Sequence, residues 1–503
     1  MPTGNELKAL LQLFPAANRP VLKKKFSSTD HLTHDSRQVK PGSVFIAVRG
    51  ERTDGHKFIS KIRDKAGVII VNQNYKIPPG GKAFFIKVSN TSSFMQKLAP
   101  AFYGFPACNL KVCGITGTNG KTSVSYMLAR AYRAAGFNPG IIGTIAVHYN
   151  GRSFPAVNTT PDICFLQQIL YQMHKAGVDA VIMEVSSHAL VLNRVQGIDF
   201  DSIIFTNLTP EHLDFHENME NYLNAKLTAF TLLQQSSKKK KQAAYWLQMT
   251  MAERVRSYLQ KLSLKSVTFG YRTVRNPPDF NTAINRQVAH GQKLSFYHHN
   301  KKIFQGRINH VGSYNALNVT AALCDVYRFL SDPGKQINAV IQNINQAVIP
   351  GRLEPVPNNK KVQIIVDYAH SPDALYNALK VLKETATRRL ICVFGCGGDR
   401  DKKKRPLMGK IAGQLADYTF LTSDNPRNEK PQAIIDDIIP GMAEVTDSYE
   451  VIPERAQAIA RAVSSLKAGD ILLIAGKGHE DYQIIGSRKI HFDDREIVSQ
   501  CLS

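Results

Sequence analysis

Residues 111–136 read KVCGITGTNGKTSVSYMLARAYRAAG, and this stretch decides the fold class. A short β-prone run is followed by a glycine-rich turn and then by a helical pattern that stops at Gly136. One face of the expected helix carries Val124, Met127, Leu128 and Tyr132. The order of strand, glycine turn and helix predicts a nucleotide-binding loop in a parallel α/β domain.

The turn itself, GTNGKTS at 117–123, has the chemistry that phosphate binding needs. Backbone N–H groups at a helix N-terminus cradle phosphates, Lys121 can reach terminal phosphates, and the Thr122 hydroxyl suits Mg²⁺. The strict phosphate-loop spacing fails, because Ile115 rather than glycine stands five residues before Gly120. We therefore predict a variant phosphate loop, and a glycine turn without a ligand is the alternative.

Two series of short apolar runs extend this pattern along the chain. The first, in 110–350, comprises LKVCGITGTNGKT, DAVIMEVSSHAL and DSIIFTNLTPEHLDFH; the second, in 351–503, comprises KVQIIVDYAHSPD, RRLICVFGCGGDRD, ADYTFLTSDNPRNE and GDILLIAGKGHED. Each run stops at polar residues, and ligands of open α/β sheets bind at the carboxyl ends of strands. We expect hairpins inserted in the central domain at about 267–305, where the pattern is polar and alternating.

The length of 503 residues and these patterns predict an α/β protein of three domains. We expect a smaller N-terminal α/β domain at 1–108, a central ATPase domain with a parallel sheet and phosphate loop at 109–350, and a Rossmann-like domain at 351–503. No apolar run is long enough to span a bilayer, and the first residues do not resemble a signal peptide.

Composition narrows the class of protein further. The seven cysteines are scattered without a CxxC pair, which argues against a disulfide framework or a zinc site and favours a reducing cytoplasm. The formal charge of +24 suggests nucleic acid as a partner, but such a field would equally draw in small polyanionic substrates. Charge alone leaves both possibilities open.

Several acidic and imidazole side chains follow the central strands. Glu184 closes the run AVIME, where a carboxylate could hold Mg²⁺ near a phosphate or could simply cap a helix. His212, Asp214 and His216 alternate, so in an extended segment they would share one face. That spacing could form a transition-metal site, but beside a phosphate loop we favour Mg²⁺ and substrate contacts.

These motifs, taken together and in order, resemble the Mur ligases. The resemblance rests on TGTNGKTS, MEVSSHAL, FTNLTPEHLDFHENMENYLNAK, GSYNALN, PGRLE, VDYAHSPDAL, GCGGDRDKKKRPLM, DNPRNE and AGKGHEDYQ, and it extends from about Asp35 to Arg495. More narrowly, the chain is similar to the members of that family that add meso-diaminopimelate. The resemblance implies ATP-dependent amide formation on a UDP-muramoyl dipeptide through an acyl phosphate, in peptidoglycan precursor synthesis. It also implies a cytoplasmic, monomeric enzyme that uses ATP and Mg²⁺, binds no nucleic acid and does not insert into a membrane.

The resemblance also assigns expected roles to particular residues. Catalytic and metal roles fall to Lys121, Thr122, Glu184, His216 and Lys226, the last as a carbamylated lysine, although the residue pattern by itself makes Lys226 an ordinary surface lysine. ATP contacts fall to Gly117, Thr118, Asn119, Gly120, Lys121, Thr122, Ser123, Asn315, Arg352 and Asp367. Contacts to the UDP substrate fall to Ser36, Glu51, Arg52, Thr53, Asn158, Thr159, Thr160, Ser186 and Arg194. Contacts to diaminopimelate fall to Arg400, Asp424, Asn425, Pro426, Arg427, Gly476 and Glu480.

Arg427 has the clearest chemical role in this set. Meso-diaminopimelate differs from lysine by a second carboxylate, and a guanidinium can meet both oxygens of that group at once. Pro426 stiffens the turn, so the guanidinium is aimed in advance. The alternative is a structural Arg–Asp pair. Departures from the family are Leu192, where a glutamine is usual, and KKKKQAAYWLQMT, where a strand usually ends in acidic residues.

Three other functions remain possible at this point. A folylpolyglutamate-type or lysine-adding ligase would use the same phosphate loop, although the DNPR and DSR segments argue against the first. A nucleic-acid-dependent ATPase would explain the charge. A non-catalytic nucleotide-binding module would not need Lys121 and Glu184.

Overall fold

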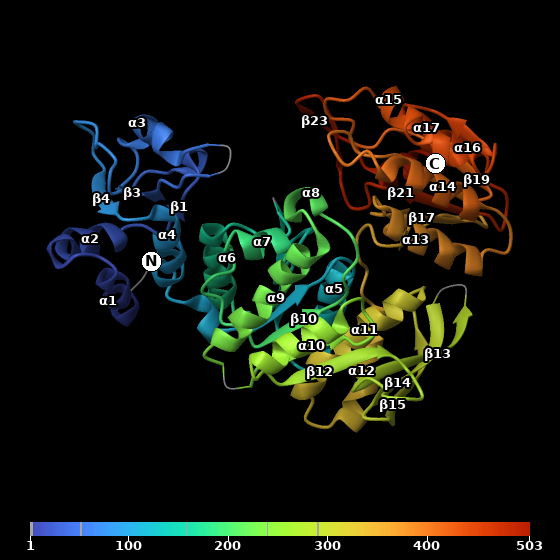
Figure 1. The fold of residues 1–503 in the computed structure, drawn as a ribbon, viewed down its shortest axis with the longest axis horizontal. Coiled ribbons are helices and arrows are strands. Elements are labelled where there is room, and N and C mark those ends of the chain that lie inside the picture. The colour runs from blue at the N-terminus through green and yellow to red at the C-terminus, as the bar shows by residue number, and fades with distance from the viewer. Residues whose placement is uncertain (1–3, 51–52, 157, 239, 289–290, 503) are drawn as a thin grey trace. The chain divides into compact units, whose positions relative to one another are not determined.

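The computed structural model describes residues 4–50, 53–156, 158–238, 240–288 and 291–502. The fold is α/β with three domains (Figure 1). By internal contacts the chain divides into two compact units, which are treated separately below. One comprises Met1–Gly270, Pro278–Phe280 and Ala321–Val340, and the other comprises Tyr271–Pro277, Asn281–Thr320 and Ile341–Ser503. The domain boundaries expected after residues 108 and 350 stay predictions.

The N-terminal domain is a parallel four-stranded sheet with helices on both faces. Its strands, in spatial order, are β1 (Leu32–Thr33), β2 (Val44–Ile46), β3 (Val68–Asn72) and β4 (Phe84–Val88). Its helices are α1 (Gly4–Gln12), α2 (Arg19–Phe26), α3 (Ile59–Ile62) and α4 (Thr91–Phe102). Alternation along β3 explains the two faces, because Val68 and Ile70 join the core with α1, α2 and α4, whereas Ile69 and Val71 join the core with α3.

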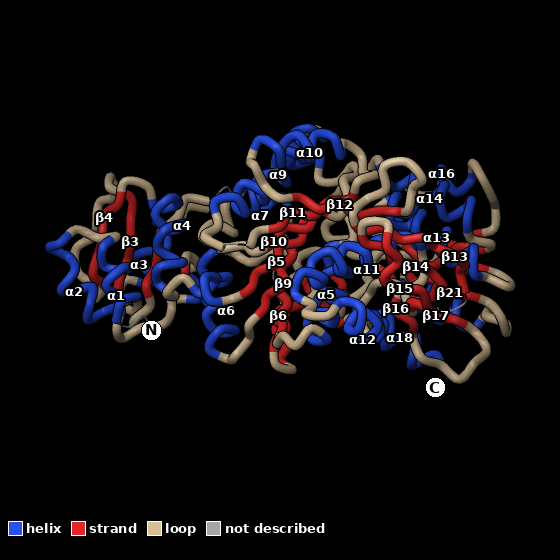
Figure 2. The backbone as a smooth tube through the Cα atoms, turned by 90° about the horizontal axis from the view of Figure 1, so that it is seen from below, coloured by secondary structure: helices blue, strands red, loops and turns tan. Residues whose placement is uncertain are grey.

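The central domain is built on a longer sheet with the order β12-β11-β10-β5-β9-β6-β7-β8. Its strands are β5 (Lys111–Thr116), β6 (Pro139–Ile142), β7 (Ala146–Tyr149), β8 (Arg152–Pro155), β9 (Ala180–Glu184), β10 (Ser202–Phe205), β11 (Gln242–Trp246) and β12 (Ser266–Tyr271). Strands β12, β11, β10, β5, β9 and β6 pair in parallel, and β7 and β8 are antiparallel. Figure 2 shows β10, β5, β9 and β6 in a row, with α6 on one side and α5 on the other.

The helices of this domain follow the strands. They are α5 (Lys121–Ala134), α6 (Ile163–Lys175), α7 (Ser187–Val191), α8 (Leu213–His216), α9 (Met219–Gln235), α10 (Ala252–Lys261), α11 (Ser313–Val326) and α12 (Pro333–Asn345). The predicted helix after the glycine turn is therefore α5, and it ends at Ala134, two residues before Gly136, because Ala135 and Gly136 form its cap. The first turn of α6 contributes Ile163 and Cys164 to the core of the N-terminal domain.

The expectation of hairpins over 267–305 is correct only in part. β12 pairs in parallel with β11, so the beginning of this stretch is a strand of the main sheet rather than a hairpin. The remainder forms β13 (Phe280–Val288), β14 (Gly291–His298) and β15 (Lys301–Ile308), and β14 and β15 pair antiparallel as expected. A partly polar strand within a larger sheet can have the same alternating sequence as a hairpin, which explains the error.

The C-terminal domain is a six-stranded sheet in the order β16-β17-β21-β18-β19-β20, parallel except for β16. Its strands are β16 (Glu354–Pro355), β17 (Gln363–Asp367), β18 (Leu390–Phe394), β19 (Tyr418–Leu421), β20 (Tyr449–Val451) and β21 (Ile471–Ala475), and β22 (Tyr482–Ile485) and β23 (Arg488–His491) form a separate hairpin. Its helices are α13 (Pro372–Thr385), α14 (Lys404–Leu415), α15 (Pro431–Asp436), α16 (Ile439–Ala443), α17 (Arg455–Ser464) and α18 (Asp494–Leu502). Two apolar cores cover the two faces, one with α13 and α14 and the other with α17 and α18.

Within the described residues, no helix combines the length and the apolar character needed to cross a bilayer.

A buried ion pair joins these last two helices to the sheet. Arg455 is 1% exposed and donates to both carboxylate oxygens of Asp494 at 2.7 Å. The same guanidinium donates to the carbonyl oxygens of Ser423 at 3.3 Å and Ala475 at 3.1 Å. These carbonyls immediately precede Asp424 and Gly476, so Arg455 fixes the ends of β19 and β21 where the expected site begins.

We predict that Arg455→Leu destabilises the C-terminal domain by about 3–5 kcal/mol, because Asp494 is left as an uncompensated buried charge. Hydrogen exchange of the β19 and β21 amides measures this loss. Arg461→Leu, on the exposed face of the same helix, is the control and should cost about 1 kcal/mol or less. Equal effects of the two substitutions would show that the pair does not hold these strand ends.

Candidate nucleotide and amino-acid sites

The β5–α5 loop is held by the end of β10. Gly117 has φ 140°, and a Cβ there would lie 2.0 Å from Thr206 Oγ1, so only glycine fits. Thr206 Oγ1 donates to the Asn119 carbonyl at 2.6 Å, and the Asn119 N–H donates to Asn207 Oδ1 at 2.8 Å. Thr206 and Asn207 were not among the predicted site residues, although they stand at the end of a predicted strand.

The turn carries the expected residues at the start of α5. Gly120 has φ 85° and precedes the first residue of the helix, Lys121. The Thr118 hydroxyl lies 3.2 Å from the Thr209 carbonyl, and the Thr209 N–H donates back to Thr118 Oγ1 at 3.0 Å. Ser123 is buried within the first turn of the helix. Backbone N–H groups therefore emerge at a helix N-terminus, as phosphate binding requires.

Two lysines converge on one carbonyl oxygen of this loop. Lys121 Nζ donates to the Gly117 oxygen at 2.9 Å and to the Thr118 oxygen at 2.8 Å. Lys226 Nζ, from α9, donates to the same Gly117 oxygen at 2.8 Å and lies over the ring of Tyr222. Lys226 is only 1% exposed, which contradicts the expectation of an ordinary surface lysine. Burial, followed by the nearby charge of Lys121, holds the pKa of Lys226 well below its usual value, so the neutral amine is favoured.

Hydroxyl groups surround the fully buried carboxylate of Glu184. Thr122 Oγ1 donates to Glu184 Oε2 at 3.0 Å, and Thr144 donates through its hydroxyl and its N–H, each at 2.9 Å. Glu184 closes β9 rather than capping a helix, which removes the structural alternative. The pair of Thr122 and Glu184 supplies the hard oxygen donors that Mg²⁺ prefers, next to a loop that can hold phosphates.

Histidines gather beside this carboxylate and its loop. His212, Asp214 and His216 do not lie in an extended segment, because the chain coils into the helical turn α8 at this point. His216 Nε2 lies 2.9 Å from Ser187 Oγ, and burial lowers the pKa of His216. Burial likewise lowers the pKa of His212 to about 4, and His188, which the sequence analysis missed, packs between them. Neutral imidazoles are therefore favoured in this cluster.

Most residues expected to contact the muramoyl peptide lie on one network at the end of β9. Thr160 Oγ1 donates to the Glu184 carbonyl at 2.8 Å and accepts from the Ser186 N–H at 3.0 Å. Arg194 donates to the Thr160 carbonyl at 3.2 Å. Thr159 Oγ1 lies 3.1 Å from Thr144 Oγ1, which ties the network to the Glu184 site. Asn158 is exposed beside it, and Leu192, at the end of α7, is also exposed.

The residues expected at the uridine end lie in the N-terminal domain. Ser36 lines a pocket of about 320 Å³ together with Arg37, Val39, Phe58, Lys61, Ile62 and Lys65. The basic side chains of this set suit an anionic ligand. Thr53 is exposed, and its carbonyl accepts from the Gly50 N–H at 2.9 Å. Glu51 and Arg52 lie outside the described residues.

In the second unit, Arg352 and Asp367 lie close together. Arg352 stacks on the ring of Tyr368, and its charge lowers the pKa of Asp367, although burial has the larger effect and the net direction is upward. Asp367 also accepts from the Leu353 N–H at 2.6 Å. Asn315 holds the start of α11, where its side chain donates to the Val311 carbonyl at 2.8 Å and accepts from Asn318 at 3.0 Å.

The DNPR turn is held rigidly by its neighbours. Arg427 has φ 51°, a strained value for an arginine, and its N–H donates to the Ile484 carbonyl at 3.0 Å. Its guanidinium donates to the Gly398 carbonyl at 2.8 Å, which ties the side chain to the neighbouring loop. A Cβ on Gly397 would lie 3.0 Å from Arg427 Nη1 and 3.8 Å from Arg400 Cγ, so the two arginines flank this glycine.

The other residues expected at diaminopimelate surround the same turn. Asn425 donates to Glu480 Oε2 at 2.8 Å and accepts from the Ile484 N–H at 2.9 Å. Gly476 has φ 116°, and a Cβ there would lie 2.5 Å from the carboxylate of Asp424. Lys477, which was not among the predicted site residues, is fully buried, and its Nζ lies 3.4 Å from Asn425 Oδ1. Pro426 is buried in the turn, and Arg400 is exposed beside it.

A second buried arginine supports the turn from behind. Arg405 has no exposed side-chain surface and donates to both oxygens of Glu429 at 2.9 Å. Glu429 also accepts from the Asp399 N–H at 2.6 Å, and Asp399 in turn accepts from the Asn428 side chain at 2.8 Å. Hydrogen bonds from Arg405 hold the pKa of Glu429 down to about 2. The 397–400 loop and the 425–429 turn are therefore joined through one ion pair.

We predict that Glu429→Gln destabilises the C-terminal domain in a pH-dependent manner. Because the folded pKa lies near 2 and the unfolded value is 4.5, the contribution of Glu429 is fully present above pH 4.5 and is lost as the pH falls toward 2. Urea unfolding of both proteins at a series of pH values measures the difference in unfolding free energy, which should be largest above pH 4.5.

Glu444→Gln is the matched control, because Glu444 makes an exposed ion pair with Lys410. Its effect should stay below about 1 kcal/mol at every pH. A Glu429 difference that does not shrink on acidification would be incompatible with the lowered pKa.

Comparisons with known proteins find a family match in each of the three domains. Family models match in order: the Mur ligase family catalytic domain at residues 29–103, the Mur ligase middle domain at 115–326 and the Mur ligase glutamate ligase domain at 351–478. The UDP-N-acetylmuramoyl-L-alanyl-D-glutamate–2,6-diaminopimelate ligase of Listeria monocytogenes is 41% identical over 494 residues, covering 97% of each chain. The protein of the same name from Lactiplantibacillus plantarum is 39% identical, covering 96% of each chain.

Solved structures are similar over the same length. One, titled as a structure of UDP-N-acetylmuramoyl-L-alanyl-D-glutamate–2,6-diaminopimelate ligase, has a TM-score of 0.64 and 28% identity, covering 94% of each chain. The MurF ligase of Thermotoga maritima in complex with ADP has a TM-score of 0.62, covers 94% of this chain and 96% of its own, and shares only the fold, at 17% identity.

Proposed function

Since the chain belongs to the Mur ligase family, we propose that it adds meso-diaminopimelate to the D-glutamate γ-carboxylate of UDP-N-acetylmuramoyl-L-alanyl-D-glutamate, with ATP as the source of energy. This reaction makes a peptidoglycan precursor. We propose meso-diaminopimelate as the amino acid because the guanidinium of Arg427 is held in place by the Gly398 carbonyl and can bind a second carboxylate. The names of the relatives agree with it.

The chemistry that such a reaction needs is activation of a carboxylate. The substrate carboxylate attacks the γ-phosphorus of ATP and displaces ADP, and the resulting acyl phosphate has a good leaving group. The incoming amine then attacks the acyl carbon, and the tetrahedral intermediate collapses with release of phosphate. The protein acts mainly by positioning the reactants and stabilising the charge that moves.

In this scheme the β5–α5 loop binds the triphosphate. The expected contacts are Gly117 to Ser123, with the amine of Lys121 moving from the loop carbonyls to the terminal phosphates. Asn315, Arg352 and Asp367 remain proposed contacts to the nucleotide. Magnesium, when bound, would neutralise phosphoryl oxygens, and Thr122 and Glu184 fit it well as neighbouring oxygen donors. The imidazole of His216 fits less well, because nitrogen is not the ligand that Mg²⁺ prefers.

We propose that Lys226 is carbamylated, so that its side chain ends in a carboxylate group. A neutral amine adds to CO₂ to give a carbamate and releases one proton, so the buried neutral amine would be replaced by an anion near the proposed metal site. The lowered pKa of Lys226 supports this, since only the neutral amine reacts. The UDP substrate is assigned to Ser36, Thr53, Asn158, Thr159, Thr160, Ser186 and Arg194, with Glu51 and Arg52 kept from the sequence analysis.

The diaminopimelate site is proposed at the carboxyl ends of β18, β19 and β21. Arg427 and Arg400 would receive the carboxylates of the amino acid, and Asp424, Asn425, Gly476 and Glu480 would contact its polar groups. Lysine in this site would leave a guanidinium without its partner, which is how a site rejects an analogue that lacks a polar group.

We also propose a cytoplasmic monomer without a nucleic-acid partner, and stimulation of ATP turnover by DNA or RNA alone would contradict that proposal.

We predict that the protein prefers meso-diaminopimelate to L-lysine and that Arg427→Ala removes the preference. The expected loss of kcat/KM for meso-diaminopimelate is at least about 10²-fold, because the second carboxylate loses a charged bidentate partner. Amide formation with ATP, Mg²⁺ and the UDP-muramoyl dipeptide, with each amino acid in turn, measures it. Arg461→Ala, in an exposed part of the same domain, should leave both rates unchanged. Equal rates for the two amino acids in the wild-type protein would exclude this role of Arg427.

We also predict a carbamate on Lys226. In the presence of ¹³C-labelled bicarbonate, the wild-type protein should show a carbamate carbon resonance that weakens as the pH falls, because protonation removes the reactive amine. Lys226→Met should lose both this resonance and most of the ligase activity. Lys175→Met, an exposed lysine of the same domain, should keep both. A resonance that survives in Lys226→Met would place the modification elsewhere.

A further inference from the structure

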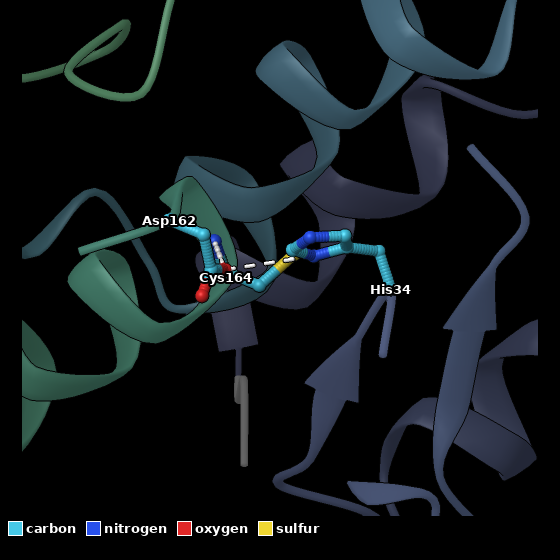
Figure 3. Close-up of side chains that lie close together, drawn as sticks. All are labelled: His34, Asp162 and Cys164. Carbon is cyan, nitrogen blue, oxygen red and sulfur yellow. Dashed lines mark hydrogen bonds and ion pairs between the residues drawn. The ribbon is translucent and has the colours of Figure 1, made fainter. Parts of the chain in front are cut away.

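Three side chains of the types that ligate metals meet at a point that includes none of the residues assigned above (Figure 3). His34 follows β1 in the N-terminal domain, and Asp162 and Cys164 belong to the start of α6. Their ligating atoms all lie within 4.8 Å of one another. The first turn of α6 packs into the core of the N-terminal domain, so the convergence is supported by that core rather than by an exposed loop.

The nitrogen and oxygen atoms of this cluster have capacity left for a further partner. His34 Nδ1 is shielded from solvent and makes no hydrogen bond with any described residue, and its contact with Asp162 Oδ1 is an ion-pair distance of 3.5 Å. Asp162 accepts from the N–H groups of Cys164 at 3.0 Å and Phe165 at 3.2 Å, both through Oδ1. Within the described part of the chain, the second carboxylate oxygen receives no hydrogen bond, although a carboxylate can accept several.

The buried thiol of Cys164 is the third candidate ligand, and with it the charge of the three ligands matches that of a divalent cation. Cys164 is 2% exposed, and burial, with a smaller contribution from Asp162, raises the pKa of its thiol well above the usual value. A cation at this point reverses that preference, because a coordinated thiol is deprotonated. One thiolate and one carboxylate then carry two negative charges, which a divalent cation neutralises.

We propose that His34 Nδ1, a carboxylate oxygen of Asp162 and Cys164 Sγ bind one divalent cation of the zinc class. Imidazole, thiolate and carboxylate are the ligands of zinc, whereas Mg²⁺ takes oxygen alone. Three protein ligands leave a fourth position for water or for an oxygen of a substrate. Binding releases the thiol proton to solvent.

The site would fix the loop that presents Ser36. His34 and Ser36 are two residues apart, and the metal would tie this loop to α6 of the central domain. The consequence for substrate, namely tighter binding of the UDP-muramoyl dipeptide with zinc bound, rests on the proposed function. The metal site itself does not.

Cobalt(II) and zinc(II) titrations of the chelator-treated full-length protein test the proposal. Wild-type protein should bind one Co²⁺ at this site with a thiolate-to-cobalt charge-transfer band, and Zn²⁺ should displace it. His34→Gln and Cys164→Ser should each lose the band and bind the metal at least about tenfold more weakly. Substituting a residue that only supports a metal ligand already costs about that much affinity, so removing a ligand should cost no less. Cys108→Ser, at an exposed cysteine of the same unit, is the control and should keep the band.

The variants also separate this site from the histidines near Glu184. A metal held by His188, His212 and His216 would give no thiolate band and would be insensitive to both substitutions. The absence of the band in wild-type protein, or its persistence in both variants, would overturn the proposal. His34→Gln keeps the buried thiol, so a folding defect of Cys164→Ser cannot account for a shared loss. Calorimetry with the UDP-muramoyl dipeptide alone tests the coupling: unchanged affinity with zinc bound would overturn the coupling but not the metal site.

Discussion

The hydrogen bond between Thr122 and Glu184 is the contact on which the nucleotide site depends. It joins the first turn of α5 to the end of β9 at 3.0 Å, inside a region closed to solvent. A carboxylate without partners would be very costly to bury there, and the hydroxyl and N–H of Thr144 complete its coordination. The same carboxylate therefore holds the start of α5 in place and would supply negative charge to the proposed metal–phosphate complex. Glu184 therefore has a structural role and a proposed chemical role at once.

In the C-terminal domain, buried cationic side chains hold the loops of the candidate site in place. The residues expected to touch the amino acid are held by side chains that would not touch it: Arg405 behind the turn, Arg455 beneath the strand ends and Lys477 beside Asn425. All three are cations with almost no exposed surface. Buried cations of this kind need several fixed acceptors, so each one defines the positions of more than one loop. An arginine in the left-handed region of the backbone can be kept only by such surroundings.

The sequence predicted those parts of the fold and of the site that local patterns determine. The strand ends, the start of α5 and the turn at 424–427 follow from apolar runs that stop at glycine, proline or polar residues. Lys226 could not be recognised from its surroundings in the sequence, because its burial depends on the packing of α9 over β5. The pairing of Arg405 with Glu429 joins residues 24 apart and has no local signature. The coil at α8 and the parallel pairing of β12 were missed for a similar reason, since a short alternating segment does not determine whether it extends or turns.

The insertion of Ile163 and Cys164 into the N-terminal core has a consequence for how such a protein can be taken apart. A cut between the first two domains would expose apolar surface on one fragment and leave a hole in the other. Chimeras that exchange the N-terminal domain between relatives would therefore need to carry the beginning of α6 with it. The module that can be transplanted as a unit is thus larger than the four-stranded N-terminal domain, because it includes the first turn of α6.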